Sequence, residues 1–334
     1  MTDTKARILI VSPRIAGTFI RQDARLLQSE FDVTLLPFLG MRSFRDLSGH
    51  IANTDVVMIW FAGRHSVPAV WLAQRHRKPV VTIVGGYEAA WIPSIGYGVR
   101  PGSLRHRALR WVLRQSRRIV AVSTVTRDGV LNVLPDVVEK LKLIYNAVDT
   151  DRFAPRESTA RDGVLCVGAI KESTIEVKGW RAFCHIATAM PDVRFTAIGP
   201  TDDFARRELI SNAPENITWK GPLYDQHLID SYQQASVYLQ ASVHESFSVA
   251  LAEAMACGCI PVTTRGGALP EVAGPAGYLI DPADLQATVG VVREALAGDQ
   301  QRRARARAQI LENFALERRR QGLTSLLTKV LAEQ

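Results

Sequence analysis

The stretch Glu245-Ser-Phe-Ser-Val-Ala-Leu-Ala-Glu253 lies between two apolar runs, 237–241 and 260–264. Each run predicts a strand, and the residues between them predict a polar loop followed by a helix from about Ser248 to Gly258. Serine is a favoured N-cap residue, and glycine is favoured just past a helix end. Because the helix is apolar on nearly every side, we expect it to be buried.

Two carboxylates flank the start of this predicted helix. Glu253 is the one charge inside it, and a buried carboxylate without a partner is costly, so we expect Glu253 either to snorkel or to meet a donor. Glu245 lies just before the helix N-terminus, whose free N–H groups and partial positive charge suit a phosphate. An anion site between two carboxylates that can hold hydroxyl groups suits a nucleotide sugar. The alternative is that Glu245 is an ordinary loop charge and that Glu253 lies on a solvated face of the helix.

Length and composition indicate a globular protein of two domains. A chain of 334 residues exceeds the usual size of one hydrophobic core, and a hydrophobic content of 47% is ordinary. No run approaches the roughly 18–20 apolar residues that span a bilayer, and Met1-Thr-Asp-Thr-Lys is no signal peptide. The four cysteines fit a reducing compartment. Cys257 and Cys259 are either a redox or metal pair or small buried side chains at a helix–strand corner.

The net charge of +8 is unevenly placed, with +10 on residues 1–150 and −2 on residues 151–334. A basic first half predicts an anionic partner for that half. We expect no nucleic acid, because zinc-finger, basic-zipper and aromatic RNA-binding signatures are missing from the sequence. No Gly-x-Gly-x-x-Gly follows the first predicted strand, which disfavours a dinucleotide-dependent oxidoreductase.

Strand and helix patterns alternate from start to finish, which predicts an α/β protein with parallel sheets and right-handed crossovers. The alternation pauses after residue 145 and resumes at 164. We therefore expect an N-terminal Rossmann-like domain at 1–150, a linker at 151–162 and a second such domain from 163. Two helical stretches follow, 284–297 and 301 to about 332. The arginines of the second stretch form either a solvated basic face or a binding surface.

The central stretch resembles the donor-site motif of the retaining family 4 glycosyltransferases. The similarity rests on Ser242-x-x-Glu-Ser-Phe-Ser-x-Ala-Leu-x-Glu-Ala-Met-Ala-Cys-Gly258, with Gly266-Gly267-Ala-Leu-Pro270-Glu271 and Gly277-Tyr-Leu-Ile-Asp281 downstream. It covers essentially the whole chain, most strongly 164–284. The resemblance implies the GT-B fold, two facing Rossmann-like domains, here an acceptor-side domain at 1–150 and a nucleotide-sugar donor domain at 163–310. The C-terminal helix, 311–334, would cross back to the first domain.

The resemblance also implies roles for individual residues. Such enzymes stabilise the diphosphate leaving group without a metal, so we expect no cofactor beyond the nucleotide-sugar co-substrate. Lys178 and Glu245 would be catalytic, binding the diphosphate and the donor sugar, and Glu253 would hold the ribose hydroxyls. Lys171 takes the place of an arginine in relatives, which keeps the charge and loses the bidentate fork. The remaining expected contacts to the donor are the backbones of Gly17, Ser246, Phe247 and Ser248, and Leu223 beside the base.

The chain departs from the family pattern after the strand predicted at 79–84. Many relatives carry a histidine there, used to contact the donor sugar, whereas this chain has Gly85-Gly86-Tyr87-Glu88. Glu88 is our third catalytic candidate. Either Glu88 or Tyr87 replaces that histidine, or Glu88 binds hydroxyl groups of the acceptor. The remaining alternative is a tight turn with a surface glutamate. His65 is a weaker candidate for the cleft, and we expect a structural role for His244.

The basic helix predicted over 104–115 has two interpretations. Its Arg105, Arg110 and Arg114 could rest on anionic lipid headgroups and bring the enzyme to a lipid-linked acceptor, or they form a solvated face over a core-facing apolar side. We expect a cytoplasmic enzyme, at the inner face of the membrane in the first case. It would transfer a hexose-type sugar to a hydroxyl of a glycan or lipid-linked acceptor in cell-envelope polysaccharide biosynthesis. A non-catalytic nucleotide-sugar-binding scaffold subunit and a GT-B nucleotide-sugar epimerase remain as alternatives.

Overall fold

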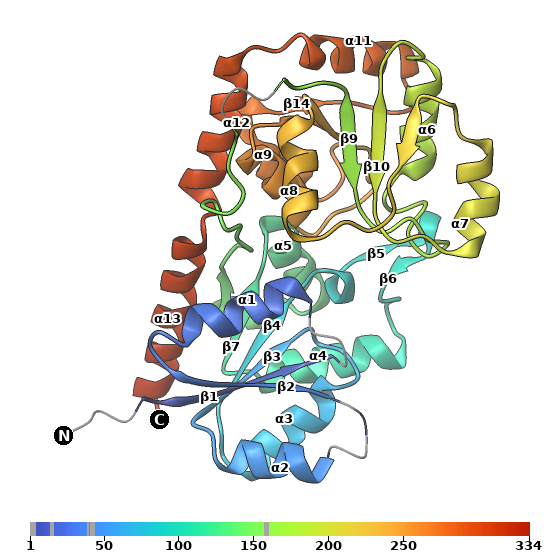
Figure 1. Ribbon diagram of the computed structural model, residues 1–334. Coiled ribbons are helices and arrows are strands. Elements are labelled where there is room, and N and C mark those ends of the chain that lie inside the picture. The colour runs from blue at the N-terminus through green and yellow to red at the C-terminus, as the bar shows by residue number, and fades with distance from the viewer. Residues whose placement is uncertain (1–4, 14–16, 39, 41–43, 157–159) are drawn as a thin grey trace. The chain divides into compact units, whose positions relative to one another are not determined.

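The computed structural model describes residues 5–13, 17–38, 40, 44–156 and 160–334. The chain divides into two compact units (Figure 1), the first of residues Met1–Asn146 with Leu316–Gln334 and the second of Ala147–Ala315. Each unit contains a six-stranded sheet in which every strand pair is parallel. Helices connect most successive strands, because parallel neighbours need a crossover connection.

The sheet of the first unit has the order β2-β1-β3-β4-β7-β8. Its strands are β1 Arg7–Ser12, β2 Asp32–Pro37, β3 Val56–Trp60, β4 Val80–Val84, β7 Arg118–Ala121 and β8 Leu141–Leu143. Its helices are α1 Thr18–Leu27, α2 Phe44–Ala52, α3 Ser66–Arg75, α4 Leu104–Gln115, α5 Thr124–Val133 and α13 Leu316–Ala332. A small hairpin, β5 Trp91–Ile92 with β6 Tyr97–Gly98, and the 3₁₀ turns η2 Tyr87–Ala89, η3 Pro93–Ile95 and η4 Pro135–Lys140 complete this unit.

Apolar side chains are buried on both faces of this sheet. Neighbouring residues of a strand point to opposite faces, so one strand contributes to both layers of the core. In β1, Ile8 and Ile10 pack with residues of α1 and α13, whereas Leu9 and Val11 pack with residues of α2, α3 and α4. Such two-sided burial explains why the central strands are apolar at nearly every position. Helix α2 was not predicted from the sequence. It follows residues 41–43, which the structure does not describe.

The sheet of the second unit has the order β11-β10-β9-β12-β13-β14. Its strands are β9 Val164–Val167, β10 Phe195–Ile198, β11 Ile217–Trp219, β12 Val237–Gln240, β13 Ile260–Thr263 and β14 Tyr278–Leu279. Its helices are α6 Trp180–Thr188, α7 Asp203–Glu208, α8 Asp225–Gln234, α9 Val249–Ala256, α10 Leu269–Ala273, α11 Leu285–Leu296 and α12 Gln300–Asn313, with 3₁₀ turns η5 Ile210–Asn212 and η6 Gly274–Ala276.

The C-terminal helix α13 belongs to the first unit, as the family resemblance implies, and a buried ion pair fixes it there. Arg319 on α13 is 2% exposed and donates from Nη2 to Oδ2 of the buried Asp23 on α1 at 2.7 Å. The same guanidinium donates to the carbonyl of Tyr145 at 2.6 Å, and Asp23 also accepts from the Trp60 indole at 3.0 Å. The basic C-terminal stretch is therefore not simply a solvated face, because one of its arginines lies in the core.

The observed division differs from the predicted boundaries at 150 and 311. Residues 147–150 lie in the second unit because Val148 pairs with Ala315 and donates to the carbonyl of Phe314 at 2.8 Å. Arg307 on α12 donates to the carbonyls of Thr150 and Phe153 at 3.1 and 3.0 Å, which ties the predicted linker to the same unit. The second helical stretch is also two helices, α12 and α13, rather than one.

Candidate functional site

The loop between β12 and α9 has the predicted helix start. Ser248 caps α9 in a left-handed backbone conformation with φ of +72°, and its hydroxyl accepts from the Leu251 amide at 3.4 Å. The same hydroxyl donates to Oε1 of Gln240, the last residue of β12, at 2.7 Å. Gly258, with φ of +87°, follows the last turn, so both predicted ends of this helix are confirmed.

Glu245 gathers polar side chains from three parts of the second unit. The residue is 8% exposed, and its Oε1 accepts from Lys178 Nζ at 2.7 Å, Gln240 Nε2 at 2.7 Å and Ser242 Oγ at 3.0 Å. These three bonds compensate the loss of water around the carboxylate. Oε2 forms no hydrogen bond with a residue that the structure describes, so it can accept one from a ligand. Glu245 is thus a buried, oriented acceptor rather than a loop charge.

Lys178 reaches Glu245 because the chain turns sharply just after it. Gly179 has φ of +67°, and a Cβ there would lie 1.9 Å from the carbonyl oxygen of Ala241. Only glycine fits both the backbone conformation and this close approach. The turn starts α6 and leaves the Lys178 side chain 30% exposed, so its ammonium is paired with Glu245 and still open to solvent.

Glu253 has the hydrogen-bond donor that its burial requires. Tyr232 on α8 donates from its hydroxyl to Glu253 Oε2 at 3.0 Å. Burial raises the pKa of the Glu253 carboxyl to about 7, although the Tyr232 hydrogen bond and the charge of Arg152 oppose that rise. Of the two predicted arrangements for Glu253, the structure shows the one in which the carboxylate meets a hydrogen-bond donor. A carboxyl with such a pKa changes charge near neutral pH.

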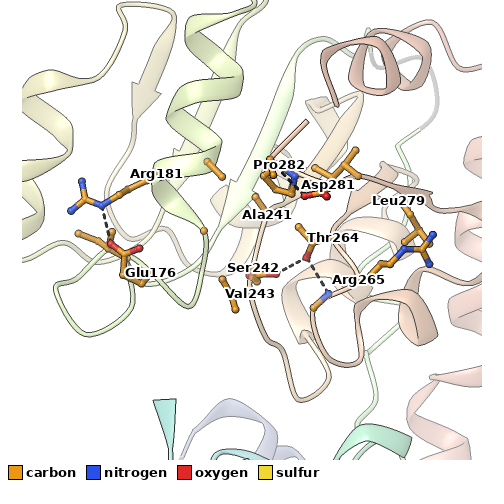
Figure 2. Close-up of a pocket in the computed structure, with 16 residues that line it drawn as sticks. Glu176, Arg181, Ala241, Ser242, Val243, Thr264, Arg265, Leu279, Asp281 and Pro282 are labelled. Atoms are coloured by element: carbon orange, nitrogen blue, oxygen red, sulfur yellow. Dashed lines mark hydrogen bonds and ion pairs between the residues drawn. The ribbon is translucent and has the colours of Figure 1, made fainter. Parts of the chain in front are cut away.

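A pocket of about 790 Å³ adjoins the Glu245 cluster (Figure 2). Gly179 and Ser242 are among the residues that line it, so it begins beside Lys178 and Glu245. Figure 2 shows the Glu176–Arg181 ion pair on one side and Arg265 with Leu279 on the other. Both charges and apolar side chains therefore line the pocket, a mixture that suits a polar organic ligand.

The other predicted donor residues of the second unit lie in loops. Lys171, in the turn before Lys178, is half-buried, and its ammonium forms no hydrogen bond within the described part of the chain. Phe247 is 2% exposed and packs on Phe314 with ring centroids 5.2 Å apart, so only its backbone can meet a ligand. Ser246 and Leu223 are half-buried. The roles proposed for these four residues stay predictions.

Two polar residues of the site, Gln240 and Tyr232, were missed in the sequence, and Ser242 was quoted in the motif without a role. Gln240 and Ser242 hold Glu245, and Tyr232 holds Glu253. Gln240 carried a signal that could have been used, because it is a polar residue in an otherwise apolar buried strand. Tyr232 carried none, since it lies 21 positions before its partner on another helix.

Comparison with known proteins identifies the family. Residues 7–152 match the family described as Glycosyltransferase Family 4, and residues 161–298 match Glycosyl transferases group 1. The MMP alpha-(1->4)-mannosyltransferase of Mycolicibacterium hassiacum is 30% identical over 193 residues, which cover 54% of this chain and 46% of that protein. The chain belongs to the family 4 glycosyltransferases.

A second curated relative matches a larger share of this chain at lower identity. The N-acetyl-alpha-D-glucosaminyl L-malate synthase of Bacillus anthracis is 24% identical over 63% of this chain and 59% of its own length. The chain thus spans about half the length of these curated relatives. HepE from Anabaena, solved in complex with UDP, has a TM-score of 0.79 at 15% identity, covering 97% of this chain and 100% of that one. The sucrose-phosphate synthase from Thermosynechococcus elongatus has a TM-score of 0.78 at 15% identity, with 99% and 100% covered. The GT-B fold predicted for this family 4 glycosyltransferase is confirmed.

In this family 4 glycosyltransferase the segment that replaces the family histidine is built around Glu88. Its carboxylate is 6% exposed and accepts from the amides of Gly85 at 3.0 Å, Gly86 at 3.1 Å and Ala62 at 3.3 Å. The interpretation as a surface glutamate is therefore wrong, because backbone amides of its own turn and of Ala62, just past β3, bind the buried carboxylate. Burial raises the pKa of Glu88 in spite of these hydrogen bonds.

Gly17 and His65 also belong to the first unit. Gly17 precedes α1 with an ordinary φ of −63°, so its backbone does not require glycine. The expected approach to a diphosphate stays a prediction, and Arg14–Ala16 of that turn lie outside the described residues. His65 Nε2 bonds to the Trp60 carbonyl at 2.7 Å, which makes this histidine a structural residue.

Three further expectations concern the whole chain of this family 4 glycosyltransferase. All four cysteines are buried and free, so Cys257 and Cys259 are small buried side chains. Among the described residues, no three or more His, Cys, Asp or Glu side chains are grouped in a way that could hold a metal ion. In the same residues no helix combines the length and apolarity needed to cross a membrane.

Proposed function

We propose that this chain is a retaining glycosyltransferase that moves a hexose-type sugar from a nucleoside-diphosphate donor to a hydroxyl of a glycan or lipid-linked acceptor. The observation that carries the proposal is the Lys178–Glu245 pair, 2.7 Å apart, beside the N-terminus of α9 and a pocket of about 790 Å³. A buried acceptor, a solvent-accessible cation and a capped helix start meet within one unit. Family membership supports the same activity.

The chemistry asks the site to stabilise negative charge on a departing nucleoside diphosphate. Lys178 is the cation for this task, and Glu245 keeps it in place. When a diphosphate arrives, the ammonium gains a second anionic partner, so its attraction grows as charge develops on the leaving group. Backbone amides of Phe247 and Ser248 at the start of α9 would supply neutral donors to the same oxygens. Lys171 would add a further charge.

Each carboxylate then has one role in binding. Glu245 would accept hydroxyl groups of the donor sugar through Oε2, while its Oε1 keeps the protein contacts. Glu253, with one oxygen held by Tyr232, would accept hydroxyl groups of the ribose. Leu223 would lie against the base, and the sugar would extend toward the pocket that begins at Ser242. We propose that no metal ion takes part, since lysine and helix N–H groups supply the positive potential.

The acceptor side is proposed for the first unit, whose segment 1–150 carries a net charge of +10. We propose a cytoplasmic enzyme of cell-envelope polysaccharide biosynthesis. Membrane contact through Arg105, Arg110 and Arg114 has weaker support than the sequence suggested. Arg110 donates to the Val133 carbonyl at 3.1 Å and Arg114 pairs with Asp136 at 3.4 Å, so two of the three arginines are engaged within the protein.

The first test is thermal stabilisation of the purified full chain by UDP, GDP, ADP and their sugars, each in EDTA and with magnesium. A ligand at a hundredfold excess over its Kd stabilises by about 2.7 kcal/mol. We expect one base to give a clear shift that is the same in EDTA. Anomeric analysis of the transfer product by NMR then tests retention. No shift with any nucleotide would refute the proposal.

One observation favours a second candidate, a nucleotide-sugar-binding scaffold subunit without turnover. The Glu88 carboxylate, in the segment where the resemblance would place a histidine, is turned toward three backbone amides rather than outward. Nucleotide-sugar binding without release of nucleoside diphosphate, with every acceptor tried, would favour this candidate.

A further inference from the structure

Two tyrosine rings meet beyond the carboxyl end of β4. Tyr87 follows β4 by three positions and is 44% exposed, and Tyr97 of β6 is half-buried. The two rings meet at 89° with centroids 5.1 Å apart, so they form a corner. In parallel α/β sheets ligands bind beyond the carboxyl ends of the strands, which is where this corner lies.

The base of this corner is rigid. Glu88, next to Tyr87, ties η2 to the ends of two strands by accepting from the amides of Gly85, Gly86 and Ala62. Tyr97 is held by the β5–β6 hairpin, in which it lies opposite Ile92. A preorganised pair of rings loses little conformational entropy when it binds a partner. Glu88 is therefore a positioning residue for the tyrosine beside it.

The chain around the corner is strongly basic. From residue 89 to 127 there are eight arginines and no aspartate or glutamate. Five of these arginines have partners within the protein: Arg110 and Arg114 as described, Arg117 and Arg118 with Glu333, and Arg127 with Asp128. The other three, Arg100, Arg105 and Arg107, are exposed, and within the described ranges no ion pair engages them.

These three unpaired arginines are those nearest to the hairpin in sequence. Arg100 follows Tyr97 by three positions, so their Cα atoms are at most about 11 Å apart. Arg105 and Arg107 lie in the first turn of α4, which has no acidic residue. Cations are unfavourable at a helix N-terminus. An anionic partner at this place would relieve that unfavourable arrangement.

We propose that Tyr87 and Tyr97, with Arg100, Arg105 and Arg107, bind a glycan acceptor that carries carboxylate or phosphate groups. The C–H groups on the face of a pyranose ring are weakly positive and pack on the negative face of an aromatic ring. The phenol hydroxyls can bond to sugar hydroxyls, and the arginines bind the anionic groups. This inference rests on the proposed function, since it names the acceptor class of that reaction.

A glycan fits this surface better than a membrane does. An amphipathic helix binds lipid by burying its apolar face among the acyl chains. In α4 the apolar residues Leu109, Val112 and Leu113 are buried in the core of the first unit and cannot do so. Of the large apolar side chains of α4, Leu104 is the one with a highly exposed surface, at 82%. Two tyrosines beside unpaired arginines suit a hydroxylated, charged polymer.

The hairpin supplies a matched control. Trp91 is 37% exposed and pairs with Gly98, whereas Tyr97 pairs with Ile92, so Trp91 and Tyr97 lie on opposite faces. The test measures the Kd of the full-length protein by calorimetry for tetragalacturonate, a phosphorylated mannotetraose and neutral maltotetraose. We expect the anionic sugars to bind at least about fivefold more tightly than maltotetraose. Tyr87→Ala and Tyr97→Ala should each weaken anionic binding about tenfold, and Trp91→Ala less than twofold.

Charge is tested in the same way. Arg100→Gln should weaken binding of the anionic sugars and lower its salt dependence, and Arg25→Gln, an exposed arginine late in α1, should do neither. The inference would be overturned if neutral and anionic sugars bound equally, or if no sugar bound. It would also be overturned if Trp91→Ala weakened binding as much as the tyrosine variants do. Binding only to phosphatidylglycerol vesicles, lost in the same variants, would overturn it in favour of a membrane. Thermal shifts with nucleotides, measured on the same variants, separate its failure from failure of the proposed function.

Discussion

Lowering the pH from 8 to 6 should weaken nucleotide-sugar binding through Glu253. Burial raises the pKa of its carboxyl to about 7. In the proposed complex Glu253 accepts hydrogen bonds from ribose hydroxyls, which the ionised carboxylate does best. A group whose pKa in the folded protein lies near 7 is mostly protonated at pH 6 and mostly ionised at pH 8. Affinity should therefore fall as the pH falls.

The expected size of the effect follows from that pKa. With a pKa of about 7, the ionised fraction is about 0.9 at pH 8 and about 0.1 at pH 6. If the ionised form alone accepts the ribose hydroxyls, the Kd rises by about tenfold over this interval. That factor corresponds to about 1.4 kcal/mol. UDP-glucose and GDP-mannose are suitable probes, because neither phosphate of a nucleotide sugar titrates between these two pH values.

Two variants act as internal controls. Glu253→Gln has no titrating group, so its affinity should be weaker than that of the wild type at pH 8 and flat between pH 6 and 8. Tyr232→Phe removes the hydroxyl that donates to Glu253 at 3.0 Å and opposes the rise in pKa. The midpoint of the affinity change should therefore move to higher pH in this variant.

Isothermal titration calorimetry at five pH values between 6 and 8 measures all three proteins. The reasoning is refuted if the wild-type Kd is constant over this range, or if Glu253→Gln keeps the wild-type pH dependence. In the first case Glu253 does not touch the nucleotide, and in the second another group titrates.

Three further predictions concern the cation, the helix that joins the first unit, and the tight turn. Lys178→Ala should lower kcat/KM about 100–1,000-fold in a donor-turnover assay, with a small change in Tm; an unchanged rate would exclude Lys178 from the site. Arg319→Ala should lower the free energy of unfolding by about 3–5 kcal/mol in urea, because the buried Asp23 loses its ion-pair partner, whereas Arg318→Ala, at an exposed position of the same helix, should cost at most about 1 kcal/mol. Gly179→Ala should abolish folding, whereas Gly290→Ala, in an exposed position of α11, should stabilise by about 0.5–1 kcal/mol; equal stability of the two variants would contradict the geometry.

Local patterns predicted the elements of the second unit well. Ser248 and Gly258 mark the ends of α9 because N-caps and left-handed C-terminal glycines depend on a few neighbouring residues. Alternation of strand and helix patterns predicted both parallel sheets for the same reason. The placement of α13 on the first unit came from the family resemblance, since no local pattern says where a helix packs.

Partners far apart in sequence could not be predicted. Lys178 and Glu245 are 67 positions apart, and Arg319 and Asp23 are 296 positions apart. A buried arginine looks the same in sequence as a solvated one, so the core position of Arg319 was not recognised. The interpretation of Glu88 as a surface glutamate was wrong because a carboxylate that turns toward nearby backbone amides leaves no periodic signal in the sequence. The break between α12 and α13 at Phe314 has no glycine or proline to mark it.

The most direct test of the account is release of nucleoside diphosphate from a saturating nucleotide sugar, in EDTA, by the wild type and by Glu245→Gln. Glu245 is 8% exposed and holds Lys178 in place, so the substitution disturbs the proposed sugar and leaving-group contacts together. We predict measurable release by the wild type without metal, and a fall of at least about a hundredfold in the turnover of the variant, larger than its loss of nucleotide affinity. No release by the wild type with any donor and acceptor tried, or equal release by both proteins, would contradict the account.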